Sequence, residues 1–402
     1  MANGAGHRKL RVATFSTLYP SSVRRGHGIF VETRLRELLR TCNVEARVIA
    51  PVPWFFSRDP RFGEYANMAR TPVRETLNGI EVLHPRFFVP PKIGMNISPF
   101  MLALGALPAF RELRRTGFDF DLIDSHYLYP DGVAAALLAK MLDVPFVVTA
   151  RGSDVTLMPR FAIPRRLIGW TVRRASACIA VSRALGDALI SLGVTGHNLH
   201  VLRNGVDLEV FQPIAMAEAR ASLGWPDQPT LLAVGNLLEN KGHHLSIEAL
   251  RYLPQYRLII VGKGPERQAL ESLAIRHGVS GRVAFAGEVP QAELRRYFSA
   301  ADVSILASAR EGWPNVLLES MACGTPVVAT RVWGTPEIVK AAEAGRLVAD
   351  RSANGLAAAV RDLMDNYPDR RVVRRYAEGF SWHATSIGQA AVFEKILAAK
   401  HE

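Results

Sequence analysis

Two glutamates with seven residues between them, Glu311 and Glu319, stand in the segment EGWPNVLLE. This segment follows the apolar run ADVSILAS, which predicts a buried strand over 301–307, and Pro314 is typical of the first turn of a helix. Free N–H groups at such a helix start favour a bound anion. Carboxylates are unfavourable beside an anion unless hydroxyl groups donate to them, and a ribose or a hexose supplies hydroxyls. The spacing therefore predicts a site for a nucleotide-activated sugar.

Two further side chains carry candidate chemistry for such a ligand. Lys241, in the motif NKG, precedes an expected helix at 243–250. A cation there would make charge-assisted hydrogen bonds to a diphosphate, each about 1.5 to 3 kcal/mol. His126 follows the apolar run LIDS, so we expect it at the edge of a sheet where a ligand binds. A lone histidine in such a place is more often a hydrogen-bonded structural residue, and both interpretations stay open at this point.

Two loops contain residues whose role the sequence leaves open. In RGSD, Arg151 and Asp154 end an expected strand, and Asp154 is either part of a binding site or the N-cap of the next helix. Gly26 and Gly28 follow the first expected strand. They form either a flexible turn or a place where a ligand approaches the backbone closely.

A glycine-rich loop, VGKGPE, follows an apolar strand at 261–266. A dinucleotide-binding fingerprint needs a third glycine, but Arg267 stands at that position. The loop therefore disfavours a dehydrogenase. In a sugar-nucleotide site it would lie near the base or the diphosphate.

Strand-like and helical runs alternate twice along the chain. The expected strands are LRVATFS, VEARVIA, DLIDSH, PFVVTA, ACIAVS and LHVLRN in the first half, and TLLAVGN, RLIIVGKG, RVAFAGE, VSILAS, PVVAT and RLVAD in the second. This alternation predicts an α/β protein with two doubly wound parallel-sheet domains and a ligand at the carboxyl ends of the strands. We place the domains at 1–208 and 209–380, with a linker near 212–229 and a final helix at 381–402 that packs back on the first domain.

Composition sets the outer limits. The chain has 402 residues, 49% of them hydrophobic, which is enough for two cores. Its net charge is +12, with most of the positive excess before residue 209, which favours an anionic partner. Cys42, Cys178 and Cys323 lie far apart and predict free thiols in a reducing cytoplasm. The start, MANGAGHRKLRVATF, lacks an apolar signal core, and PFMLALGALPAF is too short to span a bilayer. We expect a cytoplasmic protein that associates with membranes only peripherally.

Taken in order, the motifs resemble those of glycosyltransferase family 4, retaining enzymes of the two-Rossmann-domain GT-B architecture. The resemblance rests on GHGIFVETRLREL, DSHYLYPDG, RGSDV, RNGVD, VGN, NKG, VGKGPE and EGWPNVLLE, which span nearly the whole chain. It is strongest to bacterial polysaccharide and teichuronic-acid-type enzymes. It implies transfer of a hexose from a nucleotide sugar, UDP- rather than GDP-linked, to a glycan or lipid-linked glycan in cell-surface polysaccharide synthesis. It also implies that no cofactor and no essential metal are needed.

The resemblance assigns roles to individual residues. It places His126 and Glu311 at the reacting centre as catalytic residues, and Glu319 on the ribose of the donor. The remaining donor-binding positions are Lys241, Asn236, Arg203, Gly28, Lys263, Gly312, Trp313, Pro314 and Asn315. On the acceptor side it places Arg151, Asp154 and His27.

At one position the chain departs from the family pattern. Many relatives have an arginine where this chain has Asn236, so half of a two-cation diphosphate clamp is missing. Arg203, Arg310 or Lys263 can supply the second charge. We hypothesise that Arg203 does so, because RNGVD ends the first domain.

One segment of the first domain has a composition compatible with membrane contact. PRRLIGWTVRR at 164–174 fits a basic interfacial helix, although ordinary core packing with arginines on the solvated face is the favoured interpretation. Two alternative functions stay open. One is a sugar phosphorylase or sugar-nucleotide epimerase of the same fold, and the other is a basic module that binds an anionic ligand without catalysis. Nucleic acid is not an expected partner, because the basic residues are scattered and no recognised module is present.

Overall fold

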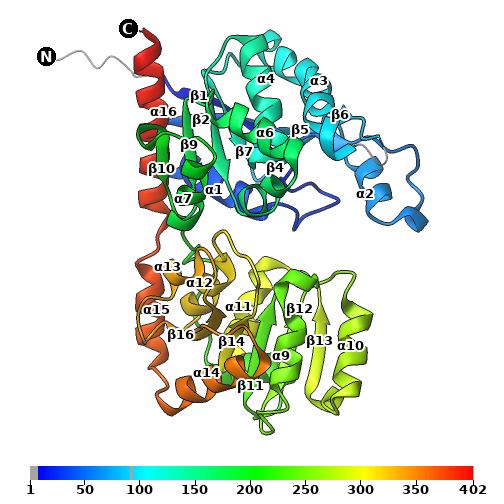
Figure 1. Ribbon diagram of the computed structural model, residues 1–402, viewed down its shortest axis with the longest axis vertical. Coiled ribbons are helices and arrows are strands. Elements are labelled where there is room, and N and C mark those ends of the chain that lie inside the picture. The colour runs from blue at the N-terminus through cyan, green and yellow to red at the C-terminus, as the bar shows by residue number, and fades with distance from the viewer. Residues whose placement is uncertain (1–7, 91–93, 402) are drawn as a thin grey trace, which may run out of the picture. The chain divides into compact units, whose positions relative to one another are not determined.

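The computed structural model describes residues 8–90 and 94–401, and the chain divides into two compact units (Figure 1). Unit 1 extends to Arg203 and takes up the chain again from His383, while unit 2 comprises Asn204–Trp382. The first division therefore falls slightly before the expected boundary at 208/209. Residues 1–7, part of the N-terminal segment considered above, lie outside the described residues.

Unit 1 is built on a sheet with the strand order β10-β9-β8-β7-β1-β2-β5-β4. All neighbouring pairs given for this sheet are parallel except β4 with β5. Its strands are β1 (Leu10–Phe15), β2 (Val44–Ile49), β4 (Arg74–Leu77), β5 (Ile80–Leu83), β7 (Leu122–His126), β8 (Phe146–Ala150), β9 (Ala177–Ala180) and β10 (Leu199–Val201). A separate short pair consists of β3 (Val52–Pro53) and β6 (Arg86–Phe87).

Helices cover both faces of this sheet. Val12, Val147 and Ile179 pack in one cluster with Leu35 of α1 and Phe393 of α16. On the opposite face, the ring of Phe15 lies 5.6 Å from that of Phe110 in α3. The elements are α1 (Ile29–Thr41), α2 (Glu64–Arg70), α3 (Gly94–Arg115), α4 (Val133–Leu142), α5 (Ser153–Thr156), α6 (Ala162–Val172), α7 (Arg183–Ser191) and α16 (Trp382–His401), with short turns η1 (Pro60–Phe62), η2 (Leu128–Gly132), η3 (Met158–Arg160) and η4 (Gly196–Asn198).

Unit 2 contains an all-parallel sheet of order β13-β12-β11-β14-β15-β16. The strands are β11 (Thr230–Val234), β12 (Arg257–Val261), β13 (Val283–Gly287), β14 (Val303–Leu306), β15 (Val327–Thr330) and β16 (Gly345–Val348). The helices are α8 (Met216–Leu223), α9 (His243–Ala249), α10 (Arg267–Arg276), α11 (Gln291–Ala300), α12 (Asn315–Ala322), α13 (Thr335–Ile338), α14 (Ala353–Asp365) and α15 (Arg370–Glu378), with turns η5 (Glu239–Lys241) and η6 (Ser280–Arg282). Strands that are buried on both faces require the continuous apolar runs seen in the sequence.

The expectation of a linker at 212–229 was wrong, because α8 occupies the middle of that segment. Arg220 of α8 is buried and donates to the carbonyl of Ala300 at 3.1 Å, and it pairs with Asp302 at 2.8 Å and Asp227 at 2.6 Å. These contacts fix α8 within unit 2. The segment MAEARASL consists largely of good helix formers, a signal that outweighs the flanking prolines.

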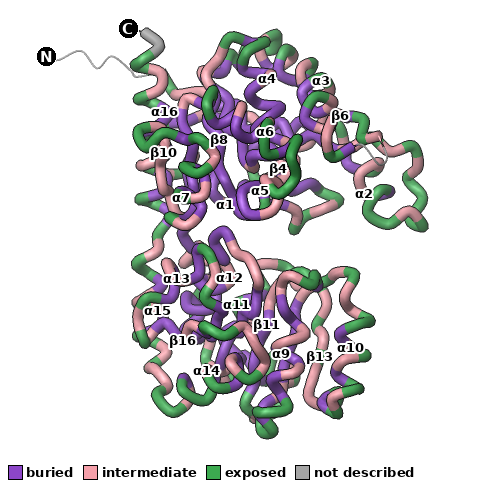
Figure 2. Tube along the Cα trace, in the orientation of Figure 1, coloured by how far each residue is buried: buried purple, intermediate pink, exposed green. Residues whose placement is uncertain are grey.

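The core of each unit follows its strands, as the buried segments in Figure 2 show. Cys178 and Cys323 are buried and Cys42 is partly exposed, and all three are free thiols. Burial raises the pKa of the Cys178 and Cys323 thiols to about 12. Among the described residues, no helix is both long and apolar enough to cross a membrane.

Candidate active site

In unit 2 the strand order reverses between β11 and β14. From β11 the chain moves outward to β12 and β13, and it then returns to β14 on the other side of β11. Open parallel sheets bind ligands beyond the carboxyl ends of their strands at such a switch point. The loops that follow Val234 and Leu306 start at these two ends and carry the motifs NKG and EGWPN.

Two glycines allow these loops to pack against one another. A Cβ at Gly242, which has φ +71°, would lie 2.1 Å from the carbonyl oxygen of Ala307. A Cβ at Gly262, with φ +144°, would lie 2.0 Å from the carbonyl oxygen of Gly235. Only glycine fits both the conformation and the space. The NKG loop thus lies directly on the loop after β14, and VGKG lies on the loop after β11.

Lys241 and Glu311 form an ion pair in this loop cluster. The Nζ atom of Lys241 is 2.6 Å from Oε1 of Glu311, and the hydroxyl of Ser308 donates to the same oxygen at 2.6 Å. The Lys241 side chain is 26% exposed and that of Glu311 10%. The structure therefore brings together two residues that the sequence separates widely, and it leaves the lysine within reach of solvent.

Glu319 lies further along α12. That helix begins at Asn315, with Pro314 as its N-cap residue and not in its first turn as expected. The Oε1 atom of Glu319 accepts from Nε2 of Gln291 at 3.3 Å. Burial raises the pKa of its carboxyl to about 7. Near neutral pH this group therefore lies close to the midpoint of its titration.

The second cation of the expected clamp has no clear position. Asn236 is exposed, and its carbonyl oxygen lies 3.2 Å from Nε2 of His243. Lys263 pairs with Glu288 at 2.7 Å on an exposed surface. Arg310 directly precedes Glu311 in unit 2 and is partly buried. Arg203 belongs to unit 1, so its contact with the donor stays a prediction.

His126 belongs to a buried hydrogen-bonded network in unit 1. Its side chain is 1% exposed, with Nε2 3.3 Å from Oδ2 of Asp124 and Nδ1 2.8 Å from Nη2 of Arg151. A guanidinium can only donate, so Nδ1 accepts and Nε2 carries the proton. Burial lowers the pKa of His126 to about 4, and the ring is neutral at physiological pH. Both ring nitrogens therefore have protein partners, and the contact of His126 with a donor sugar stays a prediction.

The network continues away from the histidine into α1 and α16. Oδ2 of Asp124 accepts from Nε2 of Gln389 at 2.9 Å, and Oε1 of Gln389 accepts from Nε of Arg34 at 2.6 Å. Arg34 is 1% exposed and also donates to the carbonyl of Leu202 at 3.1 Å. Because these groups are buried, each depends on its partners for its charge or hydrogen bonds.

The side chain of Asp154 stabilises the RGSD turn through hydrogen bonds to backbone N–H groups. Its buried carboxylate accepts from the backbone N–H groups of Gly152 at 2.7 Å, Leu128 at 2.9 Å and Arg151 at 3.2 Å. The N-cap of α5 is Gly152, so Asp154 does not cap this helix. The guanidinium of Arg151 lies 5.3 Å above the ring of Phe30 and is buried. Acceptor contacts of Arg151 and Asp154 stay predictions.

The loop after β1 is fixed by packing. Gly28 has φ +69°, and a Cβ there would lie 2.2 Å from the carbonyl carbon of Leu18, so the position requires glycine. His27 lies beside it with Nε2 3.0 Å from the carbonyl oxygen of Thr17, and burial lowers the pKa of His27 to about 4. This histidine is therefore also neutral near pH 7. Its acceptor-side role is not tested by these contacts.

Comparisons with known proteins identify the family of this chain. Residues 26–210 match the model described as Glycosyltransferase Family 4, and residues 216–380 match Glycosyl transferases group 1. TuaC of Bacillus subtilis (strain 168), a glycosyltransferase assigned to teichuronic acid biosynthesis, is 31% identical over 87% of this chain and 88% of its own length. The chain belongs to glycosyltransferase family 4.

Solved structures confirm the GT-B fold of this family 4 member. Sucrose-phosphate synthase from Thermosynechococcus elongatus superposes with a TM-score of 0.78 at 22% identity, covering 97% of this chain and 100% of that one. HepE of Anabaena in complex with UDP-glucose gives a TM-score of 0.70 at 21% identity, covering 98% and 99%. Two parallel-sheet α/β units are what the sequence predicted.

Sequence reasoning on the family 4 motifs missed several buried residues. Asp131, at the end of DSHYLYPDG, is fully buried and accepts from the backbone N–H and the hydroxyl of Thr17, both at 3.0 Å. Burial raises its pKa to about 7. Asp124, Arg34 and Gln389 were missed as well. The available signal was a charged or polar residue within an otherwise apolar strand or helix face, since such a residue needs a buried partner. Among the described residues, no group of three or more histidine, cysteine or acidic side chains can hold a metal ion.

Proposed function

We propose that this family 4 enzyme transfers a hexose from a UDP-sugar, in preference to a GDP-sugar, to a glycan or lipid-linked glycan of a cell-surface polysaccharide. The transfer retains the anomeric configuration and needs no metal. The observation that carries the proposal is the 2.6 Å contact between Lys241 and Glu311 at the switch point of unit 2. A cation and a carboxylate already positioned there match a diphosphate with a hydroxylated sugar beside it.

Lys241 is the group that recognises the donor phosphates in this proposal. When the diphosphate binds, its oxygens take over the hydrogen bonds of the ammonium group, and Glu311 is released toward the hydroxyls of the hexose. Ser308 still donates to Oε1 of Glu311 and keeps the carboxylate oriented during this exchange. Glu319, on the helix after the loop, accepts hydrogen bonds from the ribose hydroxyls.

The transfer step then follows a front-face route. The bond between the anomeric carbon and the leaving phosphate oxygen breaks, and the acceptor hydroxyl oxygen bonds to the same face of that carbon. The acceptor proton moves to the leaving phosphate oxygen, so no protein group has to accept it. Lys241 stabilises the charge that develops on the leaving UDP. A neutral, buried His126 suits this route, because the histidine is not required to take up a proton.

The preference for UDP and for a cell-surface acceptor draws support from the relatives. HepE, whose fold matches this chain, has been solved with UDP-glucose, and TuaC is assigned to teichuronic acid biosynthesis. A lipid-linked acceptor would bring the enzyme to the inner face of the membrane. The excess of positive charge on the chain fits such an anionic surface.

A donor screen tests the proposal. We expect UDP to raise the melting temperature more than GDP, oligonucleotides to leave it unchanged, and one UDP-hexose to be hydrolysed slowly without acceptor. Lys241→Ala should lose both the thermal shift and the hydrolysis. Hydrolysis of GDP-sugars alone would reject the nucleotide assignment, and an inverted anomeric signal in the NMR spectrum of the first-formed product would reject retention.

A further inference from the structure

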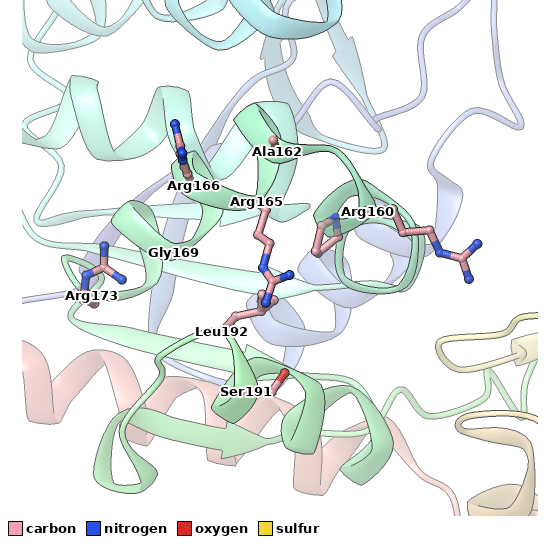
Figure 3. A pocket seen from close by; sticks show the side chains of 9 residues that line it. Arg160, Ala162, Arg165, Arg166, Gly169, Arg173, Ser191 and Leu192 are labelled. Atoms are coloured by element: carbon pink, nitrogen blue, oxygen red, sulfur yellow. The ribbon is translucent and has the colours of Figure 1, made fainter.

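Unit 1 contains a cavity of about 600 Å³ that lies outside both clusters described above (Figure 3). It is lined by one stripe of α6 and its C-cap, by the end of η3 and by the end of α7. Its size lies within the range of about 300 to 1,000 Å³ that is typical of small-molecule sites. The lining includes Arg160, Arg165, Arg166 and Arg173 and contains no acidic residue.

The helical spacing explains why a basic hollow forms here. Ala162, Arg165, Arg166, Gly169 and Arg173 recur at intervals of three or four residues along α6, so they share one side of the helix. The small residues Ala162 and Gly169 leave space between the long arginine side chains. A Cβ at Gly169 would lie 3.3 Å from Nη1 of Arg173 and 3.6 Å from the carbonyl oxygen of Leu192. A larger residue at Gly169 would therefore crowd both Arg173 and the end of α7.

The positive charges of this cavity are not neutralised by the protein. Within the described residues, the side chains of these four arginines make no hydrogen bond or ion pair to another group. Other arginines of unit 1, such as Arg47 and Arg74, pair with a carboxylate. Arg174, the next residue, turns away and stacks on Trp170, with its guanidinium 4.6 Å from the ring centre. Figure 3 shows Arg165 reaching from α6 toward Ser191 and Leu192.

Two exposed apolar residues flank the lining residue Ala162 in the sequence: Phe161 is 42% exposed and Ile163 is 45% exposed. Arg165 and Arg173 are eight residues apart, a rise of about 12 Å along a helix, so one phosphate is a poor match for both.

We propose that this arginine cavity binds a diphosphate or a comparably charged phosphate ester, with Arg165 and Arg173 as its principal contacts and Ser191 as a neutral donor. The planar guanidinium suits phosphate oxygens because it offers parallel N–H groups. The source of the phosphate is either a soluble ester or the headgroup of a membrane lipid, and both present the same chemistry. The proposal does not depend on the donor specificity, because the cavity lies in unit 1 and its occupancy is measured without a sugar donor.

Calorimetry with inorganic pyrophosphate at constant ionic strength tests the site. The full chain is compared with R165Q/R173Q, with the matched double variant R111Q/R115Q on exposed positions of α3, and with K241A, which removes the cation of the predicted donor site. We expect R165Q/R173Q to weaken one binding event about tenfold or more, and R111Q/R115Q to leave it unchanged. That event should persist in K241A. Equal effects of both double variants, or binding that depends on Lys241 only, would overturn the proposal.

Two further experiments distinguish phosphate binding from a structural role of the arginines and identify the source of the phosphate. Arg173 lies beside the end of α7. If the two arginines only stabilise the fold, R165Q/R173Q should have a lower melting temperature, and Arg165→Lys should bind pyrophosphate like the wild-type protein. For a bidentate phosphate site, Arg165→Lys weakens binding at unchanged melting temperature. Flotation with phosphatidylcholine vesicles containing cardiolipin, whose headgroup carries two phosphates, identifies the source. If R165Q/R173Q no longer floats with the vesicles while R111Q/R115Q still does, the ligand is a lipid headgroup. If the wild-type protein binds pyrophosphate but all three proteins float to the same extent, the ligand is a soluble ester.

Discussion

The two sets of motif residues lie in opposite environments. In unit 2, Lys241 and Glu311 meet at the end of the sheet with the lysine partly exposed, and their ion pair is a contact that a ligand can replace. In unit 1, His126 is enclosed, and both of its ring nitrogens have protein partners. The motif residues thus occur in two settings: a partly exposed ion pair in unit 2, and buried groups with protein partners in unit 1. Exposure and hydrogen bonding separate them where sequence does not.

The largest effect is expected where the buried network loses its anion. In Asp124→Ala, Arg34 keeps its charge in the core without that carboxylate, and Gln389 and His126 each lose a partner. Removing one member of a buried pair costs about 3 to 5 kcal/mol. The free energy of unfolding in denaturant should fall by that amount. Asp119→Ala, on a side chain that is 75% exposed, is the control and should change it by less than about 1 kcal/mol. A similar fall in the free energy of unfolding of both variants would mean that the buried network contributes no more to stability than an exposed carboxylate does.

Next in size is the loss of Lys241. Lys241→Ala removes the proposed diphosphate contact and should lower kcat/KM for sugar transfer about 100-fold, which corresponds to about 2.7 kcal/mol. Lys340→Ala is the matched control, because that lysine is exposed, lies in the same unit and has no proposed role in donor binding. It should change kcat/KM less than about twofold. If Lys340→Ala is the more damaging change, the assignment of the diphosphate contact is wrong.

Glu311 should affect turnover more than donor binding. In Glu311→Ala the hexose loses a contact beside its reacting carbon, while Lys241 becomes freer to hold the diphosphate. We expect kcat to fall about 30-fold, with donor KM changing less than about threefold. Initial-rate kinetics over a range of donor concentrations separates the two parameters. A raised KM with normal kcat would instead assign Glu311 to ground-state binding.

Local patterns predicted the frame of the molecule well. Apolar runs mark most of the strands, and the glycines of NKG and VGKG occupy positions where the structure leaves no room for a Cβ. The sequence assigned Lys241 and Glu311 to one donor site, but their ion pair was not predicted and depends on the sheet order, in which β11 and β14 are neighbours. These features depend on short segments and on a general rule for parallel sheets.

The buried network was beyond the reach of such patterns. Gln389 meets Asp124 across 265 positions of sequence, and no periodicity in either segment specifies that pairing. For His126, the sequence predicts a position at a strand end but not which groups saturate its nitrogens. That information depends on how α1 and α16 pack on the sheet, which is set by the whole core and not by local propensity.

The smallest expected effect is a pH dependence that sets Glu319 apart from the rest of the donor site. Its pKa is raised to about 7 by burial, so the folded protein keeps a proton between about pH 4.5 and 7 that the unfolded chain has released. The contribution of this group to stability is therefore fully present below about pH 4.5 and is lost as pH rises through about 7.

Donor binding should show the opposite trend. Ribose hydroxyls donate to the ionised carboxylate, so affinity for a UDP-sugar should increase severalfold from pH 6 to pH 8. A UDP-sugar is the better probe than UDP, because the terminal phosphate of UDP itself titrates near pH 6. Glu319→Gln should flatten the affinity profile and reduce the slope of the stability profile, to which buried Asp131 also contributes. Glu311→Ala should leave both slopes unchanged. If the slope of donor affinity survives in Glu319→Gln, another group controls it, and the ribose contact of Glu319 is wrong.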